Sequence, residues 1–476
     1  MNPSPPPVPV SLYKKRQKIH PREIAGRFQN WRWVFVFLTQ AVFYGLPWLQ
    51  WATEVGSRQA VLFDLEARRF YLLGMVFYPQ DFIYLTALLV VCAYALFLFT
   101  AVAGRLWCGY ACPQTVYTSI FLWVEQKIDG SKIQRERLDK APWTWDKLWR
   151  RVSKHSAWLA IALVTGFTFV GYFTPIRSLA AEVLSASLGP WQTFWIFFYA
   201  LATWGNAGFL REQVCKYMCP YARFQSAMFD RDTLIIGYDR ERGEPRGPRG
   251  RGDDLKAKNL GQCIDCGLCV QVCPTGIDIR NGLQYECIGC AACIDACDQV
   301  MDKLNYPRGL VRYDTENGIE QHLDRKTEFL RVLRPRVWVY TAVMWLIIAA
   351  VGVSLWMRPP LRFDVLRDRG ALARWNEDGQ LENVYRVQLM NLVERPQTYR
   401  IRVESTELPG VSLGTPAEVT VGPIEARWVP VSIHLPADQA PPKDGAHAVR
   451  FVVERLARGS DAVHEIAESS TFVVPR

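Results

Sequence analysis

Hydrophobic residues gather in long runs that contain no charged side chain. Five such runs, each about 20 residues long, cover residues 33–53, 82–104, 156–176, 187–210 and 337–357. About 20 helical residues cross the ~30 Å apolar core of a bilayer. Tryptophans cluster at both ends of the first run, as they do at membrane interfaces. The pattern therefore predicts a polytopic α-helical membrane protein with five spans, rather than a soluble protein with long buried helices.

The loops between these runs differ in their lysine and arginine content. Basic residues are dense before the first run and between the second and third, and sparse in the alternate loops. Because basic loops stay in the cytoplasm, we expect a basic cytoplasmic tail (1–32), four spans (33–210), a cytoplasmic segment (211–336), a fifth span (337–357) and a periplasmic domain (358–476). The net charge of +10 then reflects topology, and it indicates no nucleic-acid partner.

Thirteen cysteines all lie before residue 298, and eight of them form two matching arrays with the spacing C-x2-C-x2-C-x3-C. This is the spacing of two-cluster ferredoxins, in which the fourth cysteine of each run binds the other cluster. We therefore predict a ferredoxin-like domain with two 4Fe–4S clusters. The ligands of cluster one are Cys263, Cys266, Cys269 and Cys297, and those of cluster two are Cys273, Cys287, Cys290 and Cys293.

The residues around the arrays agree with clusters better than with other uses of cysteine. Gly267 and Gly289 suit the tight turns that wrap a cluster. Asp298 stands where the first array has Pro274, which predicts a different turn with no ligand lost. Zinc sites usually separate two C-x2-C pairs by a longer loop, and disulfides are rare on the reducing side of a membrane. The arrays thus indicate an electron relay, and an Arg- and Gly-rich linker (239–256) precedes them.

Four further cysteines form two C-x3-C-P elements after the second and fourth runs. These are Cys108 and Cys112, followed by Pro113, and Cys215 and Cys219, followed by Pro220. The i, i+4 spacing predicts that the sulfurs of each pair share one helical face. Soft thiolates favour Cu(I), zinc or a further iron–sulfur centre, so these four residues are the candidate catalytic copper site. Small residues that ease helix packing are the alternative.

The surroundings of these pairs carry further expectations. Lys216 and Arg105 should lower the pKa of the neighbouring thiols. Met218 is either a thioether ligand or a lipid-facing residue. Cys92 stands alone in the second run, and we expect it to serve packing.

Other redox cofactors find little support in the sequence. All six histidines lie outside the five runs, whereas membrane haem b usually needs histidine pairs inside the membrane. The chain has no C-x-x-C-H motif for covalent haem and no glycine-rich dinucleotide or phosphate loop. Electrons must therefore come from another protein or a small donor.

The last hundred residues have a different pattern. Hydrophobic and polar residues alternate in segments such as 385–389, 399–403, 427–434 and 449–453, with proline and glycine between them. This period of two predicts an antiparallel β-sandwich. Because no ligand or nucleophile cluster is visible there, an adhesion or assembly role is favoured over catalysis.

Taken together, these residues resemble one family closely. The matches are Phe63-Asp64, Arg68 to Tyr71, Pro79 to Phe82, the two C-x3-C-P elements and the twin arrays, in that order of parts. The chain is similar to the CcoG/FixG/RdxA family of accessory proteins of cbb3-type cytochrome c oxidase. The resemblance implies a bacterial inner-membrane protein with an immunoglobulin-like C-terminal domain, which reduces Cu(II) to Cu(I) for copper delivery during oxidase assembly.

The resemblance also implies partners, and it leaves two rival functions open. The implied partners are a cytoplasmic electron donor, copper-handling and oxidase assembly proteins and the lipid bilayer, and a homodimer is left open. One rival is a membrane quinol dehydrogenase of the periplasmic nitrate-reduction type, which shares the cysteine elements but usually lacks an outside β-domain. The other is a non-redox assembly scaffold. The residues from Leu361 onward favour the first function.

Overall fold

The chain is described by a computed structural model. It describes residues 18–53, 56–248, 259–359, 361–368, 373–393, 395–415, 417–439, 445–456 and 465–475. The first 17 residues of the predicted basic tail and most of the second half of the predicted linker lie outside these ranges. The chain forms two compact units, of which the first comprises Met1–Pro47 and Ile83–Ile348 and the second Trp48–Phe82 and Ala349–Arg476.

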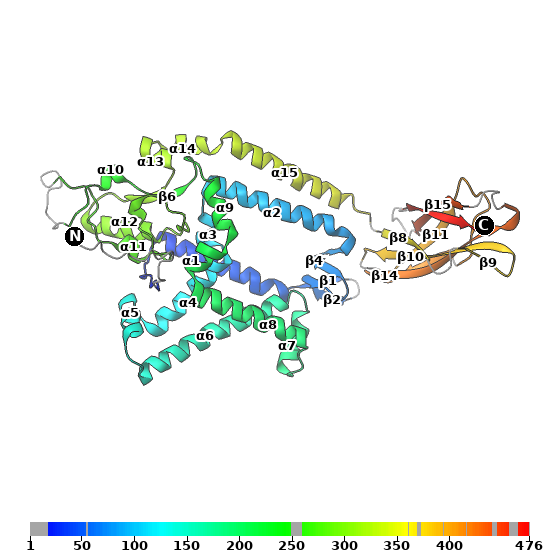
Figure 1. Cartoon of the computed structure of the whole chain (residues 1–476), viewed down its shortest axis with the longest axis horizontal. Coiled ribbons are helices and arrows are strands. Elements are labelled where there is room, and N and C mark those ends of the chain that lie inside the picture. Colours follow the sequence, from blue (N-terminus) through cyan, green and yellow to red (C-terminus); the bar gives the residue numbers. More distant parts are fainter. Residues whose placement is uncertain are drawn as a thin grey trace, which may run out of the picture. The chain divides into compact units, whose positions relative to one another are not determined.

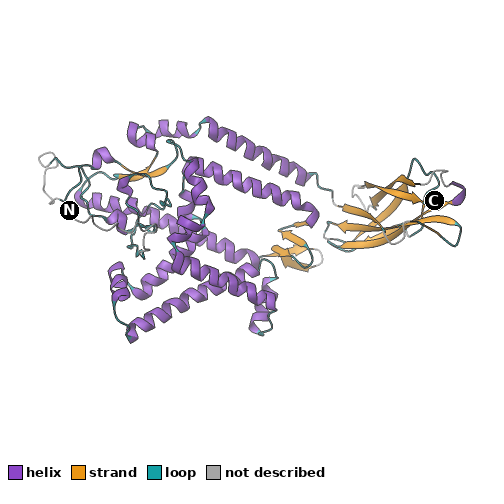
Figure 2. Cartoon of the chain, viewed as in Figure 1, coloured by secondary structure: helices purple, strands orange, loops and turns teal. Residues whose placement is uncertain are grey.

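The first unit is built mainly of helices (Figures 1 and 2). The helices before and after the cysteine-rich insert are α1 (Arg27–Gly45), α2 (Phe82–Ala103), α3 (Leu106–Tyr110), α4 (Pro113–Asp129), α5 (Lys132–Lys140), α6 (Trp145–Val170), α7 (Ile176–Leu184), α8 (Pro190–Thr203), α9 (Pro220–Met228) and α15 (Pro335–Trp356). Two π-helical segments, η3 (Trp204–Leu210) and η4 (Val214–Met218), continue from α8. Helix α6 packs along α8 and α4, around buried Phe121 and Trp158.

Each of the five predicted spans falls largely on one of these helices, with some different ends. Helices α2 and α15 match their predicted runs to within two residues. Helix α1 stops at Gly45, and residues 50–53 form a strand, because Pro47 cannot continue the helix. Helix α6 begins at Trp145, eleven residues before the predicted start at Ser156, and ends at Val170.

Helices α2 and α15 are the two in the described chain that are long and apolar enough to cross a membrane. Hardly any of their apolar stretch is buried, so neither is the core helix of a water-soluble domain. Cys92, which we predicted to serve packing, is likewise exposed on α2. A helix that is apolar on every face is typical either of a buried core or of a membrane span. The five-span layout itself stays a prediction.

The cysteine-rich insert is a small domain of short elements. They are β6 (Ile235–Tyr238), α10 (Arg240–Gly243), α11 (Leu268–Gln271), η5 (Ile279–Asn281), α12 (Ala292–Leu304), β7 (Val311–Asp314), α13 (Glu316–Gln321) and α14 (Arg325–Val332). Strands β6 and β7 pair antiparallel. Buried Ile236, Ile294 and Met301 form a core against which several array cysteines pack.

Helix α12 also fixes the start of α1. The carboxylate of Asp295 accepts hydrogen bonds from the backbone N–H groups of Phe28 and Gln29, at 3.2 and 2.8 Å. A carboxylate at a helix N-terminus satisfies free N–H groups and favours the helix dipole. This contact ties the insert to the first long helix.

The second unit begins with two small sheets that the sequence analysis did not anticipate. They are β1 (Gln50–Thr53) with β2 (Gly56–Gln59), and β3 (Val61–Asp64), β4 (Arg69–Leu72) and β5 (Met75–Phe77), between the 3-10 turns η1 (Leu46–Trp48) and η2 (Pro79–Asp81). Tyr78, at the end of this segment, is buried against Ile424 of the β-sandwich.

The sandwich confirms the strand pattern of the C-terminal residues. One sheet has the order β12 (Ser412–Leu413), β14 (Ala426–Pro436), β10 (Gln380–Asn391) and β8 (Leu361–Arg367), with β9 (Arg374–Trp375) on β10. The other has the order β13 (Glu418–Val421), β11 (Gln397–Glu404), β15 (Gly445–Arg455) and β16 (Glu465–Val474). A 3-10 turn, η6 (Ala437–Gln439), follows β14. Buried Tyr385, Tyr399 and Phe451 fill the space between the sheets.

A buried carboxylate joins the two parts of the second unit. Asp81, whose side chain is 1% exposed, pairs with Arg358 and, at 2.7 Å, with Arg362. Removing one partner of a buried ion pair costs about 3–5 kcal/mol, so we expect Asp81→Asn to raise the rate of limited proteolysis in this unit on the order of 100-fold. Glu418→Gln, which breaks the exposed pair with Arg400, is the matched control and should change little. Equal proteolysis of both variants would contradict the assigned role of Asp81.

Candidate iron–sulfur and thiol sites

The two cysteine arrays share one backbone conformation. In the first array Asp265 and Gly267 have left-handed φ values of 55° and 64°, and in the second Gly289 and Ala291 have 67° and 59°. These residues occupy the same places between the first three cysteines of each run. Left-handed residues turn the chain sharply enough for three cysteines to face one volume. The two glycines confirm the turn prediction, whereas the aspartate and the alanine adopt this conformation without a glycine to signal it.

The array thiols are close enough to influence one another. The charge of Cys290, Cys287, Cys273 and Cys269 acts on Cys293, and that of Cys269 and Cys263 acts on Cys297. Cys266 acts on Cys269 in turn. Most of these neighbours belong to the same predicted cluster, and Cys269 lies near thiols of both. The exchange of the fourth cysteine between the runs is therefore compatible with the fold.

Burial is the main influence on these thiols. It raises the pKa of Cys269 to about 11 and that of Cys287 and Cys297 to about 12. Such thiols stay protonated at neutral pH unless an iron centre displaces the proton. In the described residues no three Cys, His, Asp or Glu side chains converge as ligands of a single ion would. The two arrays present their thiols on turns of the same conformation, which fits two clusters, and the ligand assignment stays a prediction.

The two arrays differ in the backbone structure that follows their last cysteine. Pro274 follows Cys273 just after the end of α11, whereas Asp298 lies inside α12, which continues to Leu304. The Asp298 carboxylate accepts a hydrogen bond from the N–H of Gly309 at 3.0 Å. The predicted difference between Asp298 and Pro274 is thus a longer helix at the end of the second array.

The C-x3-C-P elements differ from the prediction of one helical face. Cys108 lies in α3, but Cys112 is extended (ψ 128°) and is the N-cap of α4. Cys215 lies in π-helical η4, and Cys219 is extended (ψ 111°) before α9. A proline forces the residue before it out of the helical region and then starts the next helix well. Each pair therefore spans a helix break, and the prediction was wrong.

The first of these elements lies directly against the second array. A Cβ added at Gly109 would stand 2.7 Å from the carbonyl oxygen of Gly289 and 2.9 Å from the Cα of Cys290. Cys108 and Cys215 both pack on the buried cluster that contains Cys290. Backbone thus meets backbone here because Gly109 has no side chain.

Arg105 holds three segments together at this contact. Its buried guanidinium donates to the carbonyl oxygens of Tyr285, two residues before the second array, and of Cys287 in that array. It also donates to the carbonyl oxygen of Ala222 in α9 at 2.6 Å. The Tyr313 hydroxyl donates to the Gly289 carbonyl at 2.6 Å. The helix-end element around Cys108 is therefore tied to the second array.

The four helix-end thiols are close enough to influence one another. Burial raises the pKa of Cys108 to about 11 and that of Cys215 to about 12, and neighbouring thiols add to the effect. Arg105 lowers both values by less than burial raises them. Lys216 turns to the Thr275 carbonyl at 3.1 Å instead. We expected Arg105 and Lys216 to lower the pKa of the neighbouring thiols. The net shift of the pKa is upward, so this expectation was wrong.

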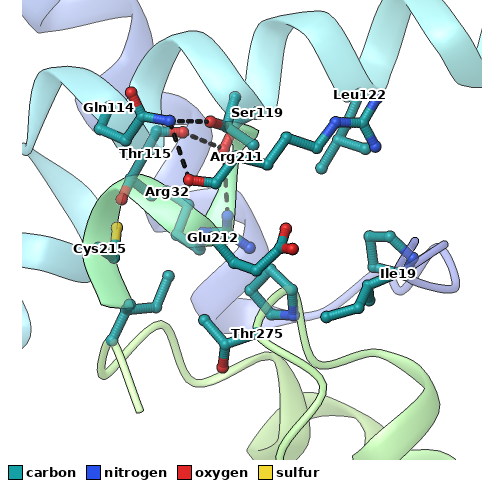
Figure 3. A pocket seen from close by; sticks show the side chains of 14 residues that line it. Ile19, Arg32, Gln114, Thr115, Ser119, Leu122, Arg211, Glu212, Cys215 and Thr275 are labelled. Carbon is teal, nitrogen blue, oxygen red and sulfur yellow. Dashed lines mark hydrogen bonds between the residues drawn. The ribbon is translucent and has the colours of Figure 1, made fainter. Parts of the chain in front are cut away.

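A small cavity of about 40 Å³ reaches Cys215 (Figure 3). Gln114 and Thr115 of α4 line it together with Arg211, Glu212 and Thr275. The Gln114 amide donates to the Arg211 carbonyl at 3.1 Å. Arg211 has a positive φ of 46° between the two π-helical segments. Strain of this kind persists where the surroundings hold a residue firmly.

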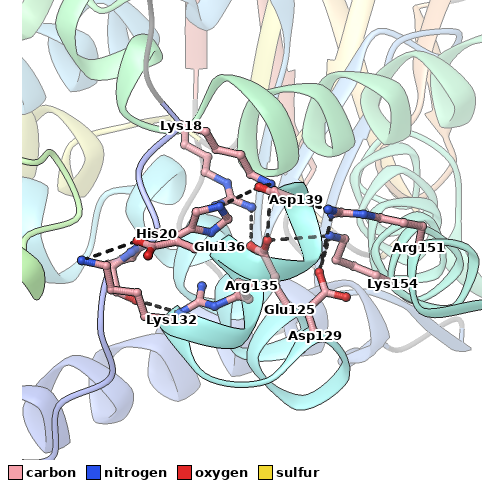
Figure 4. Close-up of polar contacts among 12 residues, drawn as sticks. Lys18, His20, Glu125, Asp129, Lys132, Arg135, Glu136, Asp139, Arg151 and Lys154 are labelled. Atoms are coloured by element: carbon pink, nitrogen blue, oxygen red, sulfur yellow. Dashed lines mark hydrogen bonds and ion pairs between the residues drawn. The ribbon is translucent and has the colours of Figure 1, made fainter. Parts of the chain in front are cut away.

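Glu125, Asp129 and Lys154 form a buried charge cluster (Figure 4), and this cluster holds Arg211 in place. Glu125, fully buried in α4, pairs with Arg211 at 2.6 Å and with Lys154 at 3.7 Å. Lys154 also pairs with Asp129 at 2.5 Å. Burial opposes ionisation of Glu125, but Arg211, Lys154 and Lys18 outweigh it and lower its pKa to about 2. Sequence analysis missed this cluster, and its only sequence signal is the i, i+4 spacing of the two carboxylates in α4.

Three family models match the chain. A model described as "4Fe-4S dicluster domain" matches residues 210–316, and "4Fe-4S binding domain" matches residues 85–130. Residues 351–475 match the model described as an "IG-like fold at C-terminal of FixG". The first two matches contain the arrays and both C-x3-C-P elements. They support iron–sulfur binding, and the third confirms the immunoglobulin-like sandwich.

Three curated proteins are similar over most of their length. Nitrogen fixation protein FixG of Rhizobium meliloti (strain 1021) is 37% identical, over 89% of this chain and 87% of its own. Protein RdxB of Cereibacter sphaeroides is 37% identical over 96% of both chains, and RdxA of the same organism is 40% identical over 83% and 84%. The crystal structure of a FixG-related protein from Vibrio parahaemolyticus is 22% identical, covers 24% of this chain and 97% of that one, and has a TM-score of 0.20. The chain belongs to the FixG/RdxA family of iron–sulfur electron-transfer proteins.

Proposed function

We propose that this protein reduces Cu(II) to Cu(I) at the helix-end thiols and hands the product on during assembly of a cbb3-type cytochrome c oxidase. Its electron donor is cytoplasmic, and its partners are copper-handling and oxidase assembly proteins, as the resemblance implies. The observation that carries the proposal is the contact between the two thiol systems, where Gly109 meets Gly289 and Cys290.

The proposal includes a place in the bacterial inner membrane. The exposed apolar helices α2 and α15 support it, because water would not tolerate their surfaces. The predicted orientation puts the arrays in the cytoplasm and the sandwich in the periplasm. Fusions of alkaline phosphatase and of a fluorescent protein to residue 476 test this, and cytoplasmic fluorescence with no phosphatase activity would contradict it.

The chemistry of the helix-end residues suits copper as a substrate. When bound, 4Fe–4S clusters supply electrons one at a time, and Cu(II) needs one electron to become Cu(I). Thiolates stabilise Cu(I) over Cu(II), so a thiol site makes the reduction more favourable. All four helix-end thiols are partly accessible, so copper can reach them.

The test compares cysteine pairs in the purified protein. Cys215→Ser with Cys219→Ser keeps the side-chain size but replaces soft ligands by poor ones. We expect copper binding to be lost and the Cu(II) reduction rate to fall at least tenfold, while the iron held by the arrays is unchanged. Cys92→Ser is the matched control, because Cys92 is an exposed lone thiol on α2. A wild-type rate in the double variant would overturn the site.

A further inference from the structure

An apolar groove of about 620 Å³ runs along α1, α4 and α6. Its walls include Trp33 and Phe37 of α1, Trp123 of α4 and Ile161 of α6. Phe37 and Trp123 are 68% and 47% exposed, so the groove opens to the surroundings of the helices. Its volume is in the range of ordinary ligand pockets. Nothing in the copper chemistry above uses it.

The groove is also lined by polar groups of α1. These groups belong to the predicted first span, so they would lie inside the membrane. Gln40 and Tyr44 line the groove, one helical turn apart on α1. The Gln40 carbonyl oxygen is buried and accepts no hydrogen bond from the described residues. The same amide interacts with the Tyr117 hydroxyl, so the carbonyl oxygen is the group left over. Tyr44 bonds to Thr165 at 2.9 Å, and its hydroxyl is thereby held in place.

An unpaired carbonyl oxygen in an apolar groove selects its ligand. A buried hydrogen-bond acceptor without a donor destabilises the protein by about 1–3 kcal/mol. A lipid acyl chain in the groove has no donor, so it would not relieve this cost. A ligand that fits must donate an O–H group, offer an aromatic face to Trp33 and Trp123, and carry an apolar tail. We propose that the groove binds a membrane-soluble hydroquinone, with its ring hydroxyl on the Gln40 carbonyl oxygen and its ring between the tryptophans.

The position of the groove connects it to the cysteine arrays. A second cavity of about 310 Å³ shares Trp33 and Trp123 with it and is also lined by Pro274 and Ala292. These two residues adjoin Cys273 and Cys293 of the predicted cluster two. A hydroquinone that is oxidised to its quinone releases two electrons, which match the reduction of two Cu(II) to Cu(I), and two protons, which pass to water. The groove therefore names a class of electron donor. The inference rests on the membrane placement of the proposed function, and it adds a donor from within the membrane to the cytoplasmic one.

Binding is measured by titration calorimetry of the purified, detergent-solubilised protein with decylubiquinol and with decylubiquinone. Gln40→Leu removes the acceptor and keeps the size, so we expect decylubiquinol affinity to fall about tenfold, the worth of one such hydrogen bond. The oxidised form cannot donate, and its affinity should change less than twofold. Thr39→Val is the matched control, since the Thr39 hydroxyl bonds to its own helix at Phe35.

A photoreactive azidoquinone in the wild-type protein gives a second measurement that needs no variant. Crosslinks on the peptides of α1 and α4 are expected. Crosslinks elsewhere, no saturable binding, or equal binding of decylbenzene would overturn the proposal. Copper reduction driven by dithionite separates the two hypotheses. Protein that reduces copper but binds no quinol contradicts the groove alone, and protein that binds quinol but reduces no copper contradicts the proposed function alone.

Discussion

Gly109→Val is expected to disconnect the helix-end thiols from the second array. The new side chain would stand 2.7 Å from the Gly289 carbonyl oxygen and 2.9 Å from the Cys290 Cα, and both are backbone atoms that cannot rotate away. Overpacking of this kind costs about 1–3 kcal/mol and moves the backbone. We expect Cu(II) reduction to fall at least tenfold, while the iron content of the arrays and the copper affinity of Cys215 and Cys219 are kept.

Gly205→Ala is the matched control, because no atom lies within 4 Å of the Cβ that it adds. It should reduce copper at the wild-type rate. If Gly109→Val also does so with its iron intact, the contact between α3 and the second array has no role in the reduction.

Acid is expected to weaken the fold around Arg211 through Glu125. The pKa of Glu125 lies near 2 in the folded chain and near 4.5 when the chain is unfolded. Its contribution to stability is therefore complete above pH 4.5 and is lost as the pH falls toward 2. The difference corresponds to about 3 kcal/mol. Glu125→Gln should lose a similar amount at pH 7, because Arg211 is then left without its buried carboxylate partner and Lys154 keeps only Asp129.

The measurement is the protease resistance of the first unit at pH 7 and pH 4. Glu136→Gln, which breaks an exposed pair with Lys132 of 3.8 Å, is the control and should behave like the wild type. A Glu125→Gln protein that is as resistant as this control at pH 7 would show that the buried cluster contributes nothing. If the wild type instead loses protease resistance as the pH rises from 4 to 7, the predicted direction of the pH effect is contradicted.

Local patterns predicted those parts of the molecule that depend on neighbouring residues alone. The runs of α2 and α15 are uniformly apolar, so their ends follow from the first charged residue or the capping proline on each side. The turns between successive cysteines of each array span about three residues, so the cysteine spacing together with Gly267 and Gly289 was enough to predict them. The alternation in β10 and β14 reflects one buried face, and it was read correctly.

Features that depend on distant parts of the chain could not be predicted in this way, whereas the helix break before Pro113 and Pro220 follows from the local rule for the residue before proline. The burial that raises the thiol pKa values comes from the second array, more than 60 residues away in the sequence, and the charge of Arg105 was visible while that burial was not. The ion pairs of Glu125 and Asp81 likewise join distant segments.

The central claim is that electrons stored in this protein reduce copper. The most direct test reduces the anaerobically purified protein with dithionite, removes the excess, adds Cu(II), and follows Cu(I) with a colorimetric chelator and the iron–sulfur absorbance together. The account predicts one Cu(I) for each electron that the protein loses, at a rate that depends on Cys215 and Cys219. Iron–sulfur absorbance that stays in its reduced form in the presence of Cu(II), with no Cu(I) above the protein-free control, would contradict it.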